Sequence, residues 1–173
     1  HSIRMSNDMS NLLNSSEIAT LFLDRDLKIR QFTAHTTKIF KLIKSDIGRQ
    51  FTDLATELSY PEMSFDAQEV LRTLVFSEKT ISSNDGQYYT IRIMPYRTFE
   101  DKIDGLVITF INATESKKFE HALTKSKYLL KSFIQNVPSI VIGLSQDGII
   151  TDFNPAAEEV FKYKRMEIIG KNY

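Results

Sequence analysis

The chain has 173 residues, of which 42% are hydrophobic and 25% are charged, and its formal net charge is zero at pH 7. This length fits one domain and part of another, and a neutral chain has no overall field that would attract nucleic acid or an anionic membrane. The absence of cysteine excludes disulfides, thiolate metal sites and cysteine-adduct flavin photochemistry, and it suits a reducing cytoplasm.

The first elements predicted are a helix over residues 1–14 and a β-hairpin over residues 18–32. Met9 and Leu12 lie at helical spacing in the first segment. The run IATLFL is rich in strand formers, and the polar residues 24–26 provide a turn before the alternating segment LKIRQF.

Two helices are expected next, each with apolar residues that repeat once per turn. The first lies within residues 33–43, and Gly48 marks its end. The second follows the loop at Pro61 and covers residues 65–76. Its apolar face consists of Val70, Leu71, Leu74 and Val75.

Three antiparallel strands are predicted to complete this domain. Residues 79–83 and 87–98 flank Asn84-Asp85-Gly86, a hairpin signal because these residue types tolerate positive φ. Residues 104–112 form a strand that is apolar on both faces, which predicts cover on both faces. Arg92 and Arg97 are expected to pair with neighbouring acids such as Asp101 or Asp104.

A long helix is predicted over residues 114–137, with Asn112 as its cap, Glu115 completing a capping box and Pro138 at its end. Its apolar residues form a narrow stripe on a highly charged rod: Phe119, Leu123, Leu130, Ile134 and Val137. Helices of this kind commonly pair. We therefore expect a homodimer formed through this helix and the N-terminal helix.

Residues 138–173 repeat the beginning of the domain after a shift of 121 positions. The shift aligns Leu23 with Leu144, Asp26 with Asp147, Ile29 with Ile150, Phe32 with Phe153 and Phe40 with Phe161. This period is too long for a solenoid and has the length of a whole small domain. We expect tandem domains, the second one truncated and either poorly ordered or completed by another chain.

The order of two strands, short helices, three antiparallel strands and a long helix resembles the PAS sensory domain over residues ~13–114, with a second beginning over ~131–173. The resemblance implies an α+β PAS fold, a five-stranded antiparallel sheet with short helices on one face and flanking terminal helices. The domains expected are an N-terminal helix (1–14), a PAS domain (15–113), a signalling helix (114–137) and a truncated second PAS domain (138–173).

The segments NDMSNLLNSSEIATLFLDRDLKIRQFT and RIMPYRTFEDKIDGLVITF are similar to the PAS domain of bacterial fused chemotaxis methylesterase/methyltransferase proteins and of related sensor histidine kinases. That family usually has Asp-Ile-Thr where this chain has Asn112-Ala113-Thr114. An asparagine can cap a helix through its side-chain oxygen, but it cannot form an ion pair.

The resemblance also implies a ligand pocket between the inner sheet face and the short helices. It assigns to this pocket the strand residues Tyr89, Ile91, Ile93, Leu106, Ile108 and Phe110, closed from the helix by Leu71 and Val75. The alternative is that these side chains only fill the core, because binding sites generally contain several converging polar groups and the Tyr89 hydroxyl is the single one here.

The sequence contains no phosphate loop, nucleophile elbow or paired-histidine metal motif. His35 and His121 lack neighbours suited to haem or metal binding, so no catalytic residue, metal ion or haem is expected and no cofactor is assigned. No apolar run approaches the roughly 20 residues that cross a bilayer.

The function expected is that of a sensory or regulatory module in a bacterial cytoplasmic signalling protein, without enzymatic activity of its own. It would bind a small molecule or dimerise, and transmit through the 114–137 helix to a histidine kinase or a chemotaxis methyltransferase. The alternative is a ligand-free scaffold for protein interaction and dimerisation.

Overall fold

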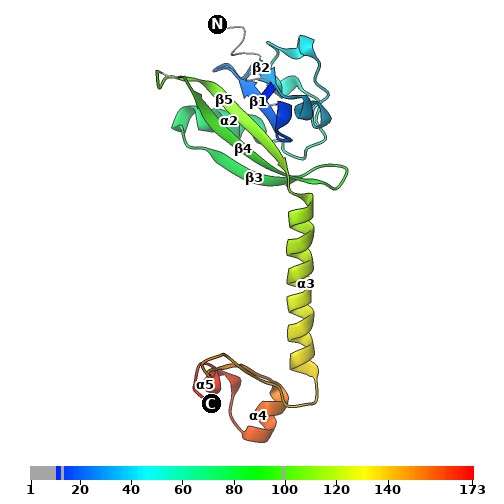
Figure 1. Cartoon of the computed structure of the whole chain (residues 1–173), viewed down its shortest axis with the longest axis vertical. Coiled ribbons are helices and arrows are strands. Elements are labelled where there is room, and N and C mark those ends of the chain that lie inside the picture. Colours follow the sequence, from blue (N-terminus) through cyan, green and yellow to red (C-terminus); the bar gives the residue numbers. More distant parts are fainter. Residues whose placement is uncertain (1–10, 13, 99) are drawn as a thin grey trace. The chain divides into compact units, whose positions relative to one another are not determined.

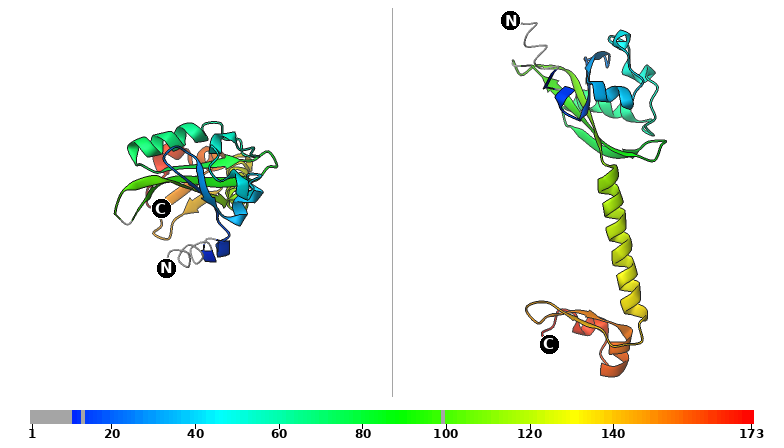
Figure 2. Two further views of the ribbon diagram at one scale, coloured as in Figure 1. Left: turned by 90° about the horizontal axis from the view of Figure 1, so that it is seen from above. Right: turned by 45° about the vertical axis from the view of Figure 1, so that its right-hand side comes forward.

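The computed structural model describes residues 11–12, 14–98 and 100–173, and the chain divides into two compact units, residues 1–117 and 118–173. The first unit is a five-stranded antiparallel sheet with helices on one face (Figures 1 and 2). The strands are β1 (Ala19–Leu23), β2 (Ile29–Phe32), β3 (Ser77–Ser82), β4 (Tyr88–Arg97) and β5 (Ile103–Asn112). Their order in the sheet is β2-β1-β5-β4-β3, which confirms the predicted five-stranded α+β fold.

The predicted helix over residues 1–14 lies mostly outside the described residues, although residues 11, 12, 14 and 15 are helical. The single helix expected within residues 33–43 is wrong. The segment contains instead the 3-10 helix η1 (Ala34–Lys38), followed later by η2 (Lys44–Asp46) and η3 (Phe51–Asp53). The physical reason is the Thr36 side chain, whose Oγ1 donates to Thr20 O of β1 at 2.9 Å and so competes with regular helical bonding. Thr33 Oγ1, just before η1, also accepts from Thr20 N at 2.9 Å.

The second predicted helix is α2 (Met63–Thr73), which is shorter than expected at its C-terminal end. Leu74 has a left-handed backbone with φ of 58° and ends the helix. Val75 and Phe76 therefore follow the helix in the chain, and both are exposed.

The core of the first unit lies between the inner face of the sheet and the helices. Alternate residues of β4 and β5 point inward, as the sequence pattern predicts, and Ile91, Ile108 and Phe110 are at most 2% exposed. The Phe110 ring packs edge-on against Phe40, with ring centroids 5.2 Å apart. Burial of these apolar surfaces supplies most of the driving force for folding.

The outer face of β5 differs from the prediction. Cover on both faces was expected, but in the part of the chain that the structure describes Val107 is only half-buried and Ile111 is 46% exposed. An antiparallel sheet tolerates one open face, because its strand connections need not cross that face.

β5 comes very close to β1 at Gly105, which has a φ of +150°. A Cβ atom at this position would lie 1.9 Å from the carbonyl oxygen of Leu23. Only glycine fits here without displacing one of the two central strands.

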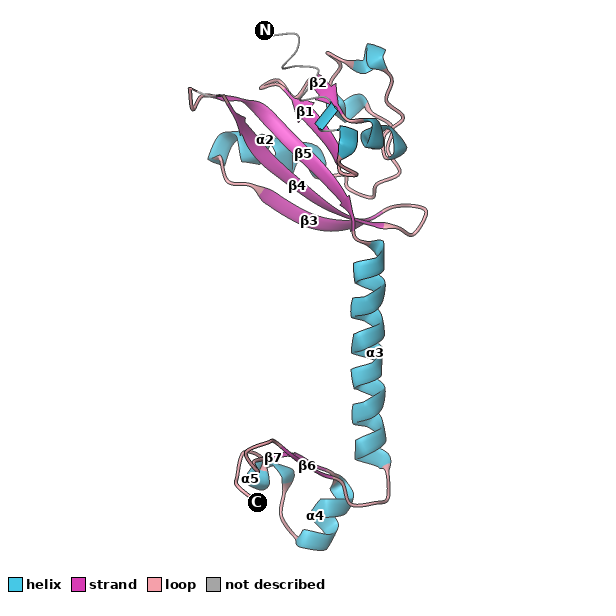
Figure 3. Ribbon diagram, in the orientation of Figure 1, coloured by secondary structure: helices cyan, strands magenta, loops and turns pink. Residues whose placement is uncertain are grey.

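The long helix α3 (Thr114–Asn136) begins two residues after the end of β5 (Figure 3). It contains none of the buried residues of the described chain. Among the residues that the structure describes, no helix combines the length and the apolarity needed to cross a membrane.

The second unit contains the hairpin of β6 (Ile142–Leu144) and β7 (Ile150–Phe153), followed by α4 (Pro155–Phe161) and α5 (Arg165–Ile168). The boundary between the two compact units falls inside α3, and the predicted domain limits stay a prediction. Ile150, Phe153 and Ala157 form a small core, and completion of this unit by another chain stays a prediction.

The second unit repeats the hydrogen bonds of the first at the 121-residue shift. Thr20 N donates to Thr33 Oγ1 at 2.9 Å, and Val141 N donates to Asn154 Oδ1 at 2.9 Å. The turns of the two hairpins match as well, because Asp24 N donates to Lys28 O and Ser145 N donates to Ile149 O, at 2.9 and 2.8 Å. The repeat in the sequence is therefore also a repeat of local structure.

The two units differ in burial at equivalent positions. Leu23 is 1% exposed and Phe40 2%, whereas Leu144 is 49% and Phe161 48% exposed. In the first unit Leu23 faces Leu106 of β5, and Phe40 packs on Phe110 of β5. The described second unit has a two-stranded sheet without a counterpart of β5, so these side chains lack that cover.

Substitution of Gly105 by alanine should lower the free energy of unfolding of the first unit by about 3 kcal/mol, because the new methyl group meets the Leu23 carbonyl. Gly48→Ala is the matched control, since Gly48 also has positive φ, +89°, but an added Cβ would have no atom within 4 Å. The control should cost about 1 kcal/mol. Urea denaturation followed by circular dichroism measures both, and equal losses would contradict the steric argument.

Substitution of Asn154 by alanine should unfold the second unit and leave the first intact. Asn154 is fully buried, accepts from Val141 N and Ala157 N, and donates to the carbonyl oxygens of Ile134 and Ser139. Its loss removes all four bonds at once and leaves the buried Ala157 N–H without its partner. Amide hydrogen exchange should become fast in residues 138–173 only, and Asn136→Ala on the exposed helix should have no such effect.

Candidate functional site

The structure places six of the eight predicted pocket residues together on the inner sheet face. Tyr89 is half-buried, and Ile91, Ile93, Leu106, Ile108 and Phe110 are at most 2% exposed within the main core cluster. These five side chains pack against other core side chains. That they also contact a ligand stays a prediction.

The two pocket residues that were predicted on the helix differ in burial and in position. Leu71 is half-buried on α2 and packs against the core. Val75 is 64% exposed and lies beyond the end of α2. Its predicted position on the helix, closing the pocket, is wrong because the left-handed residue Leu74 turns the chain away first.

A pocket of about 310 Å³ lies beside Tyr89 and Phe110 at one end of the inner sheet face. Its buried lining is apolar and consists of Ala19, Ile39 and Phe110. Its half-buried and exposed lining is polar and consists of Glu17, His35, Lys38, Tyr89 and Asn112. The sequence argument found only Tyr89 and Phe110 among these residues, because the others come from separate segments that meet through the pairing of Ala19 with Phe110.

His35 contributes an unused polar atom to this region. Its Nδ1 is buried and has no hydrogen-bond partner among the residues that the structure describes. A buried nitrogen of this kind usually has a partner. The sequence argument only found no haem or metal partners for His35 and did not place it at a pocket.

The start of α3 is tied to β4 by hydrogen bonds that include two residues of the pocket. The side-chain amide oxygen of Gln87 accepts from Asn112 Nδ2 at 3.0 Å and from the Tyr89 hydroxyl at 3.2 Å. Asn112 Oδ1 in turn accepts from Thr114 N at 3.0 Å, so the Asn112 side chain bonds to the start of the helix as expected. The N-cap position itself is Ala113, whose carbonyl accepts from Lys117 N, and the capping box with Glu115 stays a prediction. Tyr88 N donates to Thr114 Oγ1 at 3.0 Å.

The electrostatics of this corner affect Tyr89. Burial, and then the negative charge of Asp85, raise the pKa of the Tyr89 hydroxyl above its ordinary value. The hydroxyl therefore keeps its proton at neutral pH and acts as a donor toward Gln87.

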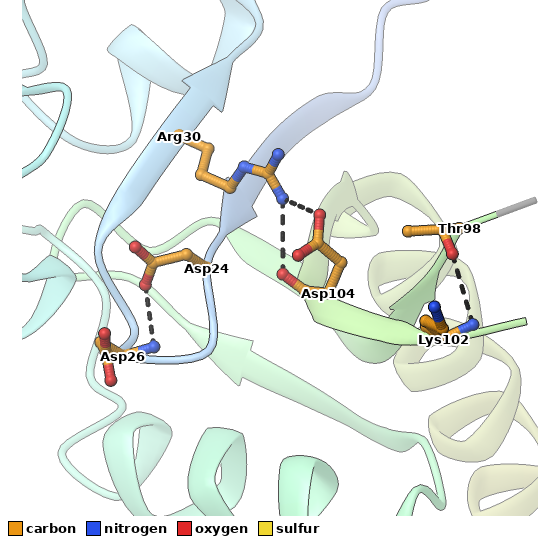
Figure 4. A network of polar contacts seen from close by, with 6 residues as sticks. All are labelled: Asp24, Asp26, Arg30, Thr98, Lys102 and Asp104. Atoms are coloured by element: carbon orange, nitrogen blue, oxygen red, sulfur yellow. Dashed lines mark hydrogen bonds and ion pairs between the residues drawn. The ribbon is translucent and has the colours of Figure 1, made fainter. Parts of the chain in front are cut away.

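A second polar group lies where the C-terminal end of β1 meets the N-terminal end of β5, at the end of these strands that is far from the pocket (Figure 4). Arg30 Nη1 donates to Asp104 Oδ2 at 2.6 Å, and Asp24 Oδ1 accepts from Asp26 N at 2.9 Å. Lys102 N donates to Thr98 Oγ1 at 3.3 Å in the β4–β5 turn. The side chains of the ion pair, Arg30 and Asp104, are 46% and 45% exposed, and a pair of this kind contributes about 0–1 kcal/mol.

The predicted partners of the two arginines on β4 are correct in part. Arg97 pairs with Asp101 at 2.8 Å, as expected. Arg92 pairs at 2.5 Å with Glu78, which lies directly opposite on β3. Asp104 pairs with Arg30 of β2 instead. The cross-strand register decides these partners.

A third polar cluster joins the loop before α2, the helix itself and β3. The Tyr60 hydroxyl and Lys79 Nζ both donate to Asp66 Oδ2, and Lys79 Nζ lies 5.3 Å from the centroid of the Tyr60 ring. Burial alone would raise the pKa of Asp66, but the hydrogen bonds from Lys79 and Tyr60 outweigh it and lower that pKa. Burial and the neighbouring Asp66 raise the pKa of Tyr60.

Comparison with protein families gives two matches to the chain. A model described as the PAS domain matches residues 9–114, and a model described as the PAS fold matches residues 128–173.

Two curated proteins and one solved structure illustrate the similarity. An uncharacterized 104.1 kDa protein of Rhodobacter capsulatus is 27% identical over 153 residues, 88% of this chain and 15% of that protein. The sensor protein FixL of Bradyrhizobium diazoefficiens is 32% identical over 91 residues, 53% of this chain and 18% of that protein. The chain thus spans less than a fifth of the length of either relative.

The solved structure is a C-terminal domain from Streptococcus mutans, with a TM-score of 0.52 and 13% identity. The similarity covers 66% of this chain and 89% of that domain. At this level of identity the likeness concerns the fold alone.

Acid should remove the contribution of Asp66 to stability. The pKa of Asp66 is lower in the folded chain than in the unfolded one, so the carboxylate stabilises the fold above the unfolded value of about 3.9 and ceases to do so as the pH falls through the folded value. Asp66→Asn should therefore be less stable than the parent chain at pH 7, and the difference should shrink below about pH 4.

Thermal unfolding between pH 3 and 7 measures this difference. Asp26→Asn, at an exposed turn position, is the control and should follow the parent chain throughout. A stability difference for Asp66→Asn that does not change with pH would contradict the assignment.

Proposed function

The chain belongs to the PAS domain family, and we propose that it is a sensory and regulatory module that transmits a signal from its sheet to a following domain through α3. The observation that carries this proposal is the junction at residues 112–114. Asn112 and Thr114 connect the first turn of α3 to Gln87 and Tyr88 beside β4.

The junction supports mechanical transmission because its bonds join two strands and a helix. Ala113 N donates to Tyr88 O at 2.8 Å, so the end of β5 stays paired with the start of β4 up to the helix. A small shift of β4 against β5 would move Gln87 relative to Asn112. A rigid helix would then carry that displacement along its length.

We propose that α3 pairs with α3 of a second copy, and that the N-terminal helix contributes to the dimer. Phe119, Leu123 and Leu130 are 75%, 58% and 60% exposed, and they lie on one narrow stripe. Ser126 and Lys127 interrupt the stripe, which weakens the pairing and leaves room for two arrangements of the helices. Such a bistable pair is suited to a switch.

For the whole protein we propose a sensor histidine kinase, and the similarity to the sensor protein FixL supports this proposal. The segments that resemble fused chemotaxis methylesterase/methyltransferase proteins favour a chemotaxis methyltransferase as the second candidate. In either protein the module would be bacterial and cytoplasmic and would lack catalytic residues. The cysteine-free composition suits that compartment.

Insertion of one residue after Lys125 in the longer protein should change its signalling output, because one residue rotates the following helix by about 100°. Insertion of seven residues is the control. It adds about two full turns, restores the helix phase to within about 20°, and should restore the output.

The output is measured as kinase or methyltransferase activity of the longer protein, with and without its stimulus. An output that ignores the one-residue insertion would contradict rigid transmission through α3. That result would favour the ligand-free scaffold, in which the module only holds partners together.

A further inference from the structure

We infer that the pocket beside the start of α3 binds a small zwitterion with an apolar side chain, of the amino-acid class, and that this ligand acts on the hydrogen bonds that begin α3. The inference gives a ligand class to the proposed sensory module, and its signalling half rests on that proposed function. The pocket differs from the core face predicted from the sequence, most of whose residues are closed off by packing.

The volume of the pocket and its buried residues indicate how large the apolar part of the ligand is. The volume is about 310 Å³, which is at the lower end for small-molecule sites. Ala19, Ile39 and Phe110 line it with buried apolar surface. An aliphatic or aromatic side chain of moderate size would gain from contact with this surface.

The charged residues of the pocket indicate which charged groups the ligand carries. Glu17 and Lys38 carry opposite charges, both are exposed, and neither has an ion-pair partner in the part of the chain that the structure describes. A ligand ammonium group matches the Glu17 carboxylate, and a ligand carboxylate matches the Lys38 ammonium group. A molecule with only one charge could pair with only one of these two groups, whereas a zwitterion can pair with both.

Three further polar groups complete the site. Tyr89 and Asn112 add an O–H and an N–H donor, which a carboxylate can accept. The His35 imidazole also lines the pocket, and its buried Nδ1 has no hydrogen-bond partner among the residues that the structure describes. The site therefore has donors for a carboxylate, an acceptor for an ammonium group and an apolar surface beside them.

Ligand binding is coupled to α3 because the two donors that would bind a carboxylate, the Tyr89 hydroxyl and Asn112 Nδ2, already form hydrogen bonds near the start of the helix. The Tyr89 hydroxyl and Asn112 Nδ2 both donate to Gln87 Oε1, at 3.2 and 3.0 Å. A ligand carboxylate that accepts from either donor competes directly with Gln87. Since Asn112 Oδ1 caps Thr114 N, rotation of the Asn112 amide alters the first turn of α3. Ligand binding then changes the hydrogen bonds of Asn112, and a change in those bonds alters the affinity for the ligand by the same factor.

Isothermal titration of the 173-residue chain tests the ligand class, with L-valine, L-leucine and L-phenylalanine as probes. Two analogues are matched to leucine: 3-methylbutan-1-amine lacks the carboxylate, and 4-methylpentanoate lacks the ammonium group. We expect saturable binding of at least one amino acid, and binding about tenfold or more weaker for the analogues. If none of the three amino acids binds, or if a singly charged analogue binds equally well, the zwitterion assignment is wrong.

Two substitutions tie binding to this pocket. Lys38→Gln and Glu17→Gln should each weaken binding about tenfold or more, and both positions are exposed, so the fold is retained. Lys102→Gln and Glu100→Gln are the matched controls, because that pair is exposed in the β4–β5 turn, and they should bind like the parent chain. Binding that is unaffected at Lys38 and Glu17 would overturn the inference.

The coupling between the pocket and α3 is tested separately, by side-chain amide resonances and amide hydrogen exchange. On addition of the amino acid that binds, the side-chain amide resonances of Asn112 should shift and amide exchange in residues 115–118 should change rate. Gln87→Ala should produce a similar change without ligand. Binding without any change at Asn112 and α3 would show that the pocket is not linked to the helix.

This test separates the inference from the proposed function. Absence of binding together with an output that depends on the phase of α3 would overturn the inference and leave the proposed function in place. Binding together with an output that ignores the helix phase would support the pocket and overturn transmission through α3.

Discussion

The antiparallel pairing of β1 with β5 is the contact on which the rest of the first unit depends. It joins residues more than 80 positions apart in the sequence, Ala19 with Phe110 and Leu23 with Leu106. The pairing makes β5 the central strand, closes the core over Leu23 and Phe40, and brings Glu17, Ala19 and η1 to the end of β5 where α3 begins. Gly105 permits it, because any larger residue would collide with the Leu23 carbonyl.

The second unit is an internal comparison that separates local from long-range effects. Its hairpin, its turn and the bonds at Asn154 reproduce those of the first unit at the 121-residue shift, so these features form from local sequence. Leu144 and Phe161 nevertheless remain about half exposed, whereas their equivalents Leu23 and Phe40 are buried. The burial of those side chains is therefore a property of β5 and not of the segment that carries them.

The polar groups of the first unit divide into two kinds. The exposed ion pairs, such as Arg30 with Asp104 and Arg92 with Glu78, follow strand register and contribute little to stability. A second group, the half-buried Gln87 and Tyr89 with the exposed Asn112, lies where the sheet passes into α3. Since a change in one of those bonds also alters the cap of a long helix, this corner is suited to convert binding into movement.

The sequence by itself determined the order of the elements, the tandem repeat, the inward faces of β4 and β5 and the bond of Asn112 to the start of α3, because alternation, turn residues and side-chain capping act over a few residues. Only the tertiary structure decided the 3-10 form of η1, the exposure of Val75 and Ile111 and the composition of the pocket. Thr36 of η1 bonds to β1, and the pocket gathers residues from 17 to 112. Hydrophobic periodicity shows which face of an element is apolar, but it does not show which distant segment will meet that face, and long-range strand pairing sets that meeting.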